Sequence, residues 1–199
     1  MGQNKLYPVF LRLNRFTILI VGGGKVGMEK LHFILKSSPD AHIRLVAIEI
    51  SDEIRALAVQ FPQVQLMEKA FDSSDIQDVR LVIAATSDRE VNQAVYQLAR
   101  EKGILVNVAD TPELCDFYLG SIVTKGDLKI GISTNGQSPT FAKRFREMLE
   151  DALPDSIGGI LEKLSEIRAQ LAGDFREKIE KLDEITEVLR GDKQQRPDT

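Results

Sequence analysis

RFTILIVGGGKVGMEKLHFIL, residues 15–35, is the stretch that decides the fold. It opens with the apolar, β-branched run 16–21, which is typical of a strand buried on both faces of a parallel sheet. Gly22, Gly24 and Gly27 follow in the spacing G-x-G-x-x-G, and apolar residues at helical spacing come next. The order strand, glycine turn, helix is the order that a dinucleotide site requires.

Each glycine has a separate role in such a site. Gly22 permits the tight turn, Gly24 lets the backbone approach a pyrophosphate, and Gly27 lets the helix pack on the strand. A purely structural turn uses glycines too, so the motif by itself leaves that alternative open. A phosphate loop of the Walker type is disfavoured, because no Lys-Ser or Lys-Thr pair follows at the needed distance.

The chain continues as an alternation of strands and helices. Apolar runs predict further buried strands, and helical spacing predicts helices between them. The expected strands are 43–48, 64–67, 81–85 and 104–108, and the expected helices are 51–61 and 90–102. The pattern indicates an α/β fold with a doubly wound, Rossmann-type parallel sheet.

Two polar residues follow predicted strands at the edge where open α/β sheets bind ligands. Glu49 would accept hydrogen bonds from an adenosine ribose and repel a 2′-phosphate, which favours NAD over NADP; the alternative is a solvated loop carboxylate. Thr86 is a candidate cofactor contact, and the alternative is a loop in which Ser87 or Asp88 only caps the next helix.

Asp110 also ends a predicted strand on the ligand side. Its carboxylate can act as a general base or a substrate anchor. The other interpretation is an Asx-type turn formed with Thr111-Pro112.

The pattern changes after Asp110. Runs 117–124 and 128–133 predict a β-hairpin, which needs a partner surface in this chain or in a second subunit. Ser138 is a helix N-cap before the predicted helix 140–153. That helix carries cations that suit an anionic substrate or form a solvated face: Lys143, Arg144 and Arg146.

Two amphipathic helices and a polar tail complete the chain. Helical spacing predicts helices over 157–171 and 175–189, whose apolar faces need covering. The tail 191–199 is polar, and we expect it to be disordered.

Composition narrows the function further. The net charge of −4 argues against nucleic acid as the main partner. The one cysteine, Cys115, excludes a disulfide framework and a cysteine-based metal site, and we expect a buried filler there. Without an apolar leader or a run long enough to span a membrane, the chain is expected to be cytoplasmic.

Four stretches taken together resemble the bacterial precorrin-2 dehydrogenases, the NAD-dependent module of sirohaem synthases. The stretches are GGGKVGMEK, LVIAATSDREVN, VNVADTPELCDF and SIVTKGDLKIGISTNGQSPTFAKRFREMLE, and the likeness covers residues 6–165. It implies oxidation of precorrin-2 to sirohydrochlorin with NAD, in a homodimer, with Fe²⁺ chelation in some members. Members of that family usually carry alanine where Gly27 stands.

The resemblance also implies site residues. It places Asp110 as the functional aspartate, with polar donors and cations as anchors for an anionic substrate. The implied cofactor site is Gly22, Gly24, Lys25, Val26, Gly27, Ile48, Glu49 and Thr86, and the implied substrate site is Ser133, Thr134, Asn135, Ser138, Lys143 and Arg144. It implies no metal ligand, because His32 and His42 lie away from this face.

The implied organisation has an NAD-binding Rossmann domain (1–112), a mixed α/β dimerisation domain (113–153) and a helical domain (154–190). A different class of protein stays open as the alternative. A regulatory module that senses NAD without catalysis would share the Rossmann half, but it has no need of Asp110 or of the 133–138 loop.

Overall fold

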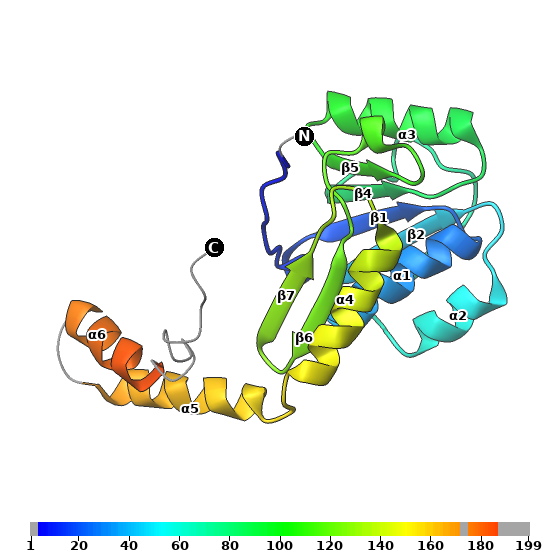
Figure 1. Cartoon of the computed structure of the whole chain (residues 1–199). Coiled ribbons are helices and arrows are strands. Elements are labelled where there is room, and N and C mark those ends of the chain that lie inside the picture. The colour runs from blue at the N-terminus through cyan, green and yellow to red at the C-terminus, as the bar shows by residue number, and fades with distance from the viewer. Residues whose placement is uncertain (1–3, 172–174, 187–199) are drawn as a thin grey trace. The chain divides into compact units, whose positions relative to one another are not determined.

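The computed structural model describes residues 4–171 and 175–186, and the chain divides into two compact units after Gly120. Figure 1 shows the elements of both.

The first unit is built on a five-stranded parallel sheet in the order β3-β2-β1-β4-β5. After a short 3-10 turn at Leu13–Arg15, its elements are β1 (Thr17–Val21), α1 (Lys25–Ser37), β2 (His42–Ala47), α2 (Asp52–Val59), β3 (Val64–Glu68), β4 (Val79–Ala84), α3 (Arg89–Glu101), β5 (Leu105–Val108) and a 3-10 turn at Pro112–Leu114. The order reverses between β1 and β4, the switch point at which such sheets bind ligands. The predicted Rossmann-type sheet is confirmed.

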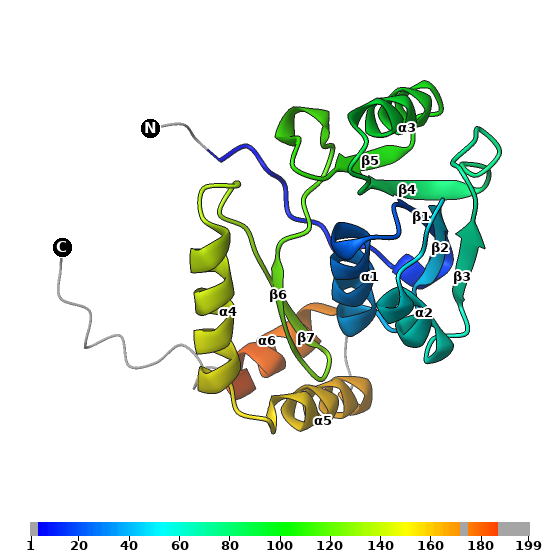
Figure 2. The same cartoon turned by 90° about the vertical axis from the view of Figure 1, so that its right-hand side faces the viewer.

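Helices cover both faces of this sheet. Ile18 and Ile20 of β1 pack with Leu31 of α1 and Ile54 of α2, whereas the alternate residues of β1 face α3. Figure 2 shows α1 and α2 on one side of the strands and α3 on the other. Burial on both faces explains why these strands are continuous apolar runs in the sequence.

The second unit is smaller and has little interior. It contains β6 (Ser121–Lys125), β7 (Leu128–Ile132), α4 (Pro139–Ala152), α5 (Ile157–Gln170) and α6 (Phe175–Thr186). The two strands form an antiparallel hairpin, and α4 packs on β6. Among the described residues of this unit, Val123 and Ala142 are the buried apolar side chains.

The predicted start of the hairpin was wrong by four residues. Phe117 and Leu119 pack against the core of the first unit, and the strand begins only at Ser121. Their apolar character comes from that packing and not from a strand. The predicted tail 191–199 lies outside the described residues.

Candidate functional site

The loops after β1, β2, β4 and β5 meet at the carboxyl edge of the parallel sheet, and backbone hydrogen bonds beyond the strands hold them together. The Gly22 N–H donates to Val46 at 2.9 Å, and the Ala85 N–H donates to Val21 at 2.8 Å. Ala109 continues the series by donating to Ala84 at 2.9 Å. The loops at this edge are therefore joined by backbone hydrogen bonds, and the predicted cofactor residues and Asp110 all lie on them or at the start of α1.

The glycine loop leaves no room for side chains at two of its positions. Gly22 has φ +130°, and a Cβ there would overlap the carbonyl of Ala85. A Cβ on Gly27 would overlap the carbonyl oxygen of Gly22, so even alanine is excluded in this loop geometry. At Gly24 a Cβ would meet open space, which leaves its backbone accessible to a ligand.

The amino end of α1 is open, unlike that of α3. Gly24 supplies no side-chain cap, and the first turn of α1 has no acidic residue. In α3, by contrast, the Asp88 carboxylate accepts from the N–H groups of Glu90 and Val91. The N–H groups of the first turn of α1, which begins with Lys25 and Val26, are thus available to an anion such as a pyrophosphate.

Ile48 and Glu49 follow β2 on the same edge, and both side chains are exposed. A Cβ on Gly23 would overlap the carbonyl oxygen of Glu49, so this loop touches the glycine loop. The Glu68 carboxylate holds the loop after β2 by accepting a hydrogen bond from the Ile50 N–H at 3.3 Å. A hydrogen bond from Arg55 holds the pKa of Glu68 below its usual value, which keeps Glu68 as an accepting carboxylate.

Thr86 is fixed by a residue that the sequence reasoning missed. The Thr86 hydroxyl lies 2.8 Å from Oδ1 of Asn92, and Asn92 Nδ2 donates to the Thr86 carbonyl at 3.0 Å. The Thr86 hydroxyl also accepts from the Asp88 N–H at 3.1 Å. Asn92 is only 8% exposed, so it acts as an internal clamp on the β4–α3 loop. Asp88, one of the two residues considered as the cap, is the N-cap.

Asp110 stands two residues beyond β5 with its backbone at φ +57°, a conformation that few residues except glycine adopt readily. Its side chain is exposed, and no hydrogen bond or ion pair to another described residue engages its carboxylate. A non-glycine residue held in this conformation is a feature that clusters at functional sites. The carboxylate is thus presented to solvent at the ligand edge.

Cys115 contacts the backbone on both sides of Asp110 through its sulfur. Its sulfur accepts from the Val108 N–H at 3.3 Å and lies 3.3 Å from the Thr111 carbonyl oxygen. Asn107, 7% exposed, lies alongside and donates to the Phe117 carbonyl at 2.8 Å. Cys115 is half-buried rather than fully buried as predicted. This partial burial still raises the pKa of its thiol, which makes it a poor nucleophile and suits a structural role.

The predicted substrate residues lie in the second unit, where their own loop uses several of the side chains. Ser138 caps α4 by accepting from the Phe141 N–H at 3.1 Å, and the Thr134 hydroxyl accepts from the Ser138 N–H at 3.2 Å. The Ser133 hydroxyl likewise accepts from the Asn135 N–H at 3.2 Å. The cations of this set, Lys143 and Arg144, are exposed on α4.

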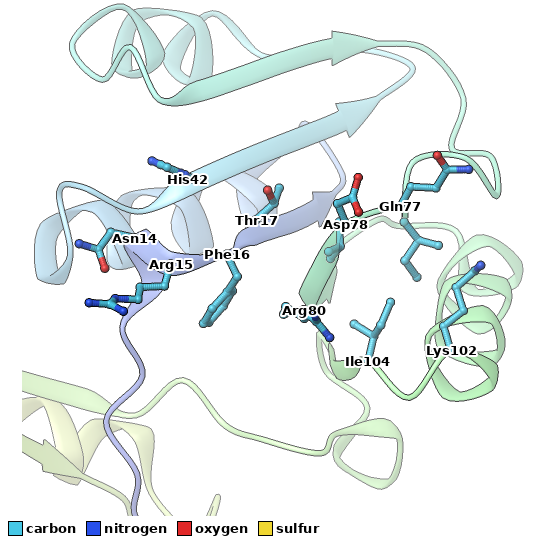
Figure 3. A pocket seen from close by; sticks show the side chains of 12 residues that line it. Asn14, Arg15, Phe16, Thr17, His42, Gln77, Asp78, Arg80, Lys102 and Ile104 are labelled. Carbon is cyan, nitrogen blue, oxygen red and sulfur yellow. The ribbon is translucent and has the colours of Figure 1, made fainter.

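Three further observations bound the site. Within residues 4–171 and 175–186, no group of three His, Cys, Asp or Glu side chains is placed to hold a metal ion. In the same ranges, no helix has the length and apolar character needed to cross a bilayer. A cavity of about 820 Å³ lies at the opposite, amino edge of the same sheet from the glycine loop and Asp110 (Figure 3).

Comparisons with known proteins agree with this geometry. The model of a family of NAD(P)-binding domains matches residues 9–121, and the model of the central part of sirohaem biosynthesis proteins matches residues 125–152. The chain is 37% identical to a siroheme synthase of Nitrosomonas europaea and 38% identical to one of Methylococcus capsulatus, over 86% of its own length in each case. It spans 34% of the length of these curated relatives.

A solved structure is similar over nearly the whole chain. SirC, a precorrin-2 dehydrogenase, superposes with a TM-score of 0.75 at 28% identity, covering 90% of this chain and 89% of that one. The range matched by the NAD(P)-binding model, residues 9–121, includes the glycine loop. The chain therefore belongs to the NAD(P)-binding family of the sirohaem biosynthesis proteins.

Proposed function

We propose that this chain is an NAD-dependent dehydrogenase that oxidises precorrin-2 to sirohydrochlorin. The observation that carries the proposal is the carboxyl edge of the sheet, where the open amino end of α1 and the exposed Asp110 carboxylate belong to one connected set of loops. A cofactor site alone needs only the first of these features. The likeness to SirC, a precorrin-2 dehydrogenase, supports this choice of substrate.

Asp110 is the proposed general base. The reaction removes two electrons and two protons from the reduced macrocycle, and NAD⁺ supplies the hydride acceptor. Asp110 takes the remaining proton and releases it to solvent, because its exposed carboxylate is in contact with water. The reactants precorrin-2 and NAD⁺ thus give sirohydrochlorin, NADH and one proton.

Glu49 is the proposed determinant of cofactor choice. Its exposed position next to the glycine loop suits a carboxylate that accepts from the ribose hydroxyls of NAD. Asp52 and Glu53 in the first turn of α2 add negative charge to the same loop, which disfavours the 2′-phosphate of NADP.

The second unit is proposed to hold the anionic substrate and to form a homodimer. Lys143 and Arg144 are exposed cations suited to carboxylates, next to the polar loop 133–138. The same helix α4 exposes three large apolar side chains, Phe141, Phe145 and Met148. With two strands in its hairpin and few buried side chains, the predicted dimerisation segment 113–153 gains a covered surface when two copies associate.

The test is anaerobic turnover of precorrin-2 by the full chain with NAD⁺, followed by absorption as sirohydrochlorin forms. NADP⁺ and Fe²⁺ are supplied in separate arms. We expect oxidation that requires NAD⁺ and runs at least about tenfold slower with NADP⁺. Conversion beyond sirohydrochlorin only with iron and protein together would add chelation.

The outcomes separate the enzyme from the alternative. NAD⁺ binding measured by calorimetry without any turnover would contradict the enzyme and favour the sensor of cofactor. Equal rates with the two cofactors would remove Glu49 from the specificity argument while leaving the dehydrogenase intact.

A further inference from the structure

The cavity at the amino edge of the sheet lies wholly within the first unit. Residues at the starts of β1, β2 and β4 line it, together with the segments just before β1 and β5 (Figure 3). Since β1 has five residues, about 16 Å of strand separates this cavity from the glycine loop. Its volume of about 820 Å³ is enough for a small organic ligand.

The lining is cationic although the chain as a whole is acidic. Arg15, Arg80 and Lys102 face one carboxylate, Asp78, so the cavity carries an excess of two positive charges in a chain of net charge −4. Within the part of the chain that the structure describes, none of the three cations forms an ion pair or a side-chain hydrogen bond, and all three are exposed. Asn14 and His42 add side-chain hydrogen-bonding groups to the lining.

The backbone is irregular where it brings Arg80 to the cavity. Thr17 of β1 pairs with Val79 and Ile18 pairs with Leu81, so Arg80 is an extra residue in a β-bulge. Bulges are rare between parallel strands, and they re-aim a side chain. Asp78, two residues earlier, has φ +60°, a strained conformation for a residue with a side chain. The bulge at Arg80 and the positive φ of Asp78 are thus two backbone irregularities in the segment that lines this side of the cavity.

Helix dipoles explain only one of the cations. Lys102 is the C-cap of α3, where a positive charge is favourable without any ligand. Arg80 lies in a strand and Arg15 ends a single 3-10 turn, so neither gains this stabilisation to a comparable degree. Their position around one cavity leaves both guanidinium groups available to an anionic ligand.

Apolar side chains line part of the cavity. Ile76 is buried, and Phe16 and Ile104, which Figure 3 labels, are half-buried. Apolar side chains next to guanidinium and ammonium groups suit a ring that carries oxyanions at its periphery.

We propose that this cationic groove, lined by Arg15, Arg80 and Lys102 over Phe16 and Ile104, is a second ligand site for a small organic anion that presents carboxylates or phosphates from an apolar ring. The site is separate from the proposed dehydrogenase site, and its occupant need not be the substrate. Arg80 and Arg15 pair with the oxyanions in the manner of guanidinium forks, and the ring lies on Phe16.

The test uses ¹H–¹⁵N NMR of the full chain titrated with mellitate, a benzene ring with carboxylates, and in parallel with inorganic pyrophosphate, which has charge but no ring. We expect saturable shifts of the amides lining the groove, with mellitate binding more tightly. Arg80→Gln should weaken mellitate by about tenfold, the loss of one charge-assisted contact. NAD⁺ binding by the same variant should be unchanged.

Lys36→Gln is the matched control. Lys36 is likewise an exposed cation at the carboxyl end of a helix, yet it does not line the groove. We expect Lys36→Gln to bind mellitate with the same affinity as the unmodified chain. Asp110→Asn should also bind mellitate with unchanged affinity. The outcome of this test therefore does not depend on whether the dehydrogenase proposal holds. Equal weakening by Arg80→Gln and Lys36→Gln, or shifts confined to the carboxyl-edge loops, would overturn the site. Pyrophosphate binding as tightly as mellitate would overturn the role of the apolar side chains.

Discussion

The two units of this chain bury apolar surface very differently. In the first unit, strands such as β1 and β4 are buried on both faces, and two apolar clusters enclose the sheet. In the second, Val123 and Ala142 are the buried apolar side chains among the described residues, while Phe141 is 58% and Met148 is 52% exposed. The first unit completes its own core. The second leaves large apolar side chains of α4 exposed.

The difference suggests a division of labour. A rigid, self-sufficient sheet can hold a cofactor and a base in fixed geometry, because its loops are anchored by a packed core. A hairpin unit with few buried side chains is suited to subunit association and to binding a large substrate. Five predictions test this division, in order of expected effect.

The largest effect is expected at Asp110. Asp110→Asn should lower the rate of precorrin-2 oxidation by about 10²–10⁴-fold, the usual contribution of a general base, with NAD⁺ affinity retained. Lys143→Gln in the second unit should instead raise KM for precorrin-2 and leave NAD⁺ affinity unchanged. Steady-state kinetics and calorimetry measure both. A rate loss shared equally by the two variants would contradict the division.

Two fully buried valines compare the cores directly. Val82 in β4 and Val123 in β6 are both 0% exposed. Val82→Ala should lower the free energy of unfolding by about 2–3 kcal/mol, because a dense core cannot close the cavity. Val123→Ala should cost about 1 kcal/mol, since its thin surroundings can collapse. Hydrogen exchange in each unit measures the two losses, and equal losses would remove the contrast.

The exposed face of α4 tests the need for a partner. If Phe141 is covered in a homodimer, Phe141→Ser should raise the dissociation constant by about tenfold or more, because burial of a Phe side chain is worth about 1.5–3 kcal/mol. Val59→Ser is the control, since Val59 is 84% exposed in the first unit. Sedimentation at several concentrations measures both. A monomer in the unmodified protein at micromolar concentration would exclude the dimer.

Asn92 tests how rigidly the first unit holds its site. Asn92→Ala removes the side-chain donor to the Thr86 carbonyl and one of the partners of the Thr86 hydroxyl, at a cost of about 1–3 kcal/mol. We expect a higher Kd for NAD⁺ and faster exchange in residues 85–88, with the sheet itself intact. Gln97→Ala, at an exposed position of the same helix, should change neither. Unchanged NAD⁺ affinity in Asn92→Ala would show that the hydrogen bonds between Asn92 and Thr86 do not contribute to cofactor binding.

The smallest effect concerns exposed ion pairs, one in each unit. A hydrogen bond from Lys69, supported by Ser74, holds the pKa of Asp72 well below its usual value, and Lys125 lowers that of Asp155. A carboxyl with a lowered pKa in the folded state stabilises above about pH 4 and loses that effect as the pH falls further.

Asp72→Asn and Asp155→Asn should therefore each make stability less dependent on pH below about pH 4. The change should be larger for Asp72, since it also accepts from the backbone and hydroxyl of Ser74. Thermal unfolding between about pH 2 and 6 measures this. A steeper acid dependence in either variant would contradict the sign.

Much of the first unit follows from local sequence signals. The glycine spacing, the apolar strands and the helical periodicity each arise from neighbouring residues, so the order of elements and the ligand edge were predictable. The hairpin start was not, because Phe117 and Leu119 are apolar for packing on a distant core and a strand has the same composition. Nor did the sequence distinguish Asp88 from Ser87 as the cap, since either side chain can accept from the backbone.

Local sequence was enough to specify the α/β alternation, the dinucleotide turn and the polar residues that end its strands, because these depend on residues close together in the chain. The folded chain alone revealed that α1 has no side-chain cap while α3 has one, and that Asn92 holds Thr86 by hydrogen bonds. It also revealed that Arg80, in a β-bulge, lines the same cavity as Arg15 and Lys102. Residues far apart in the chain become neighbours only when the sheet assembles, and contacts of that kind leave no periodic trace in the sequence.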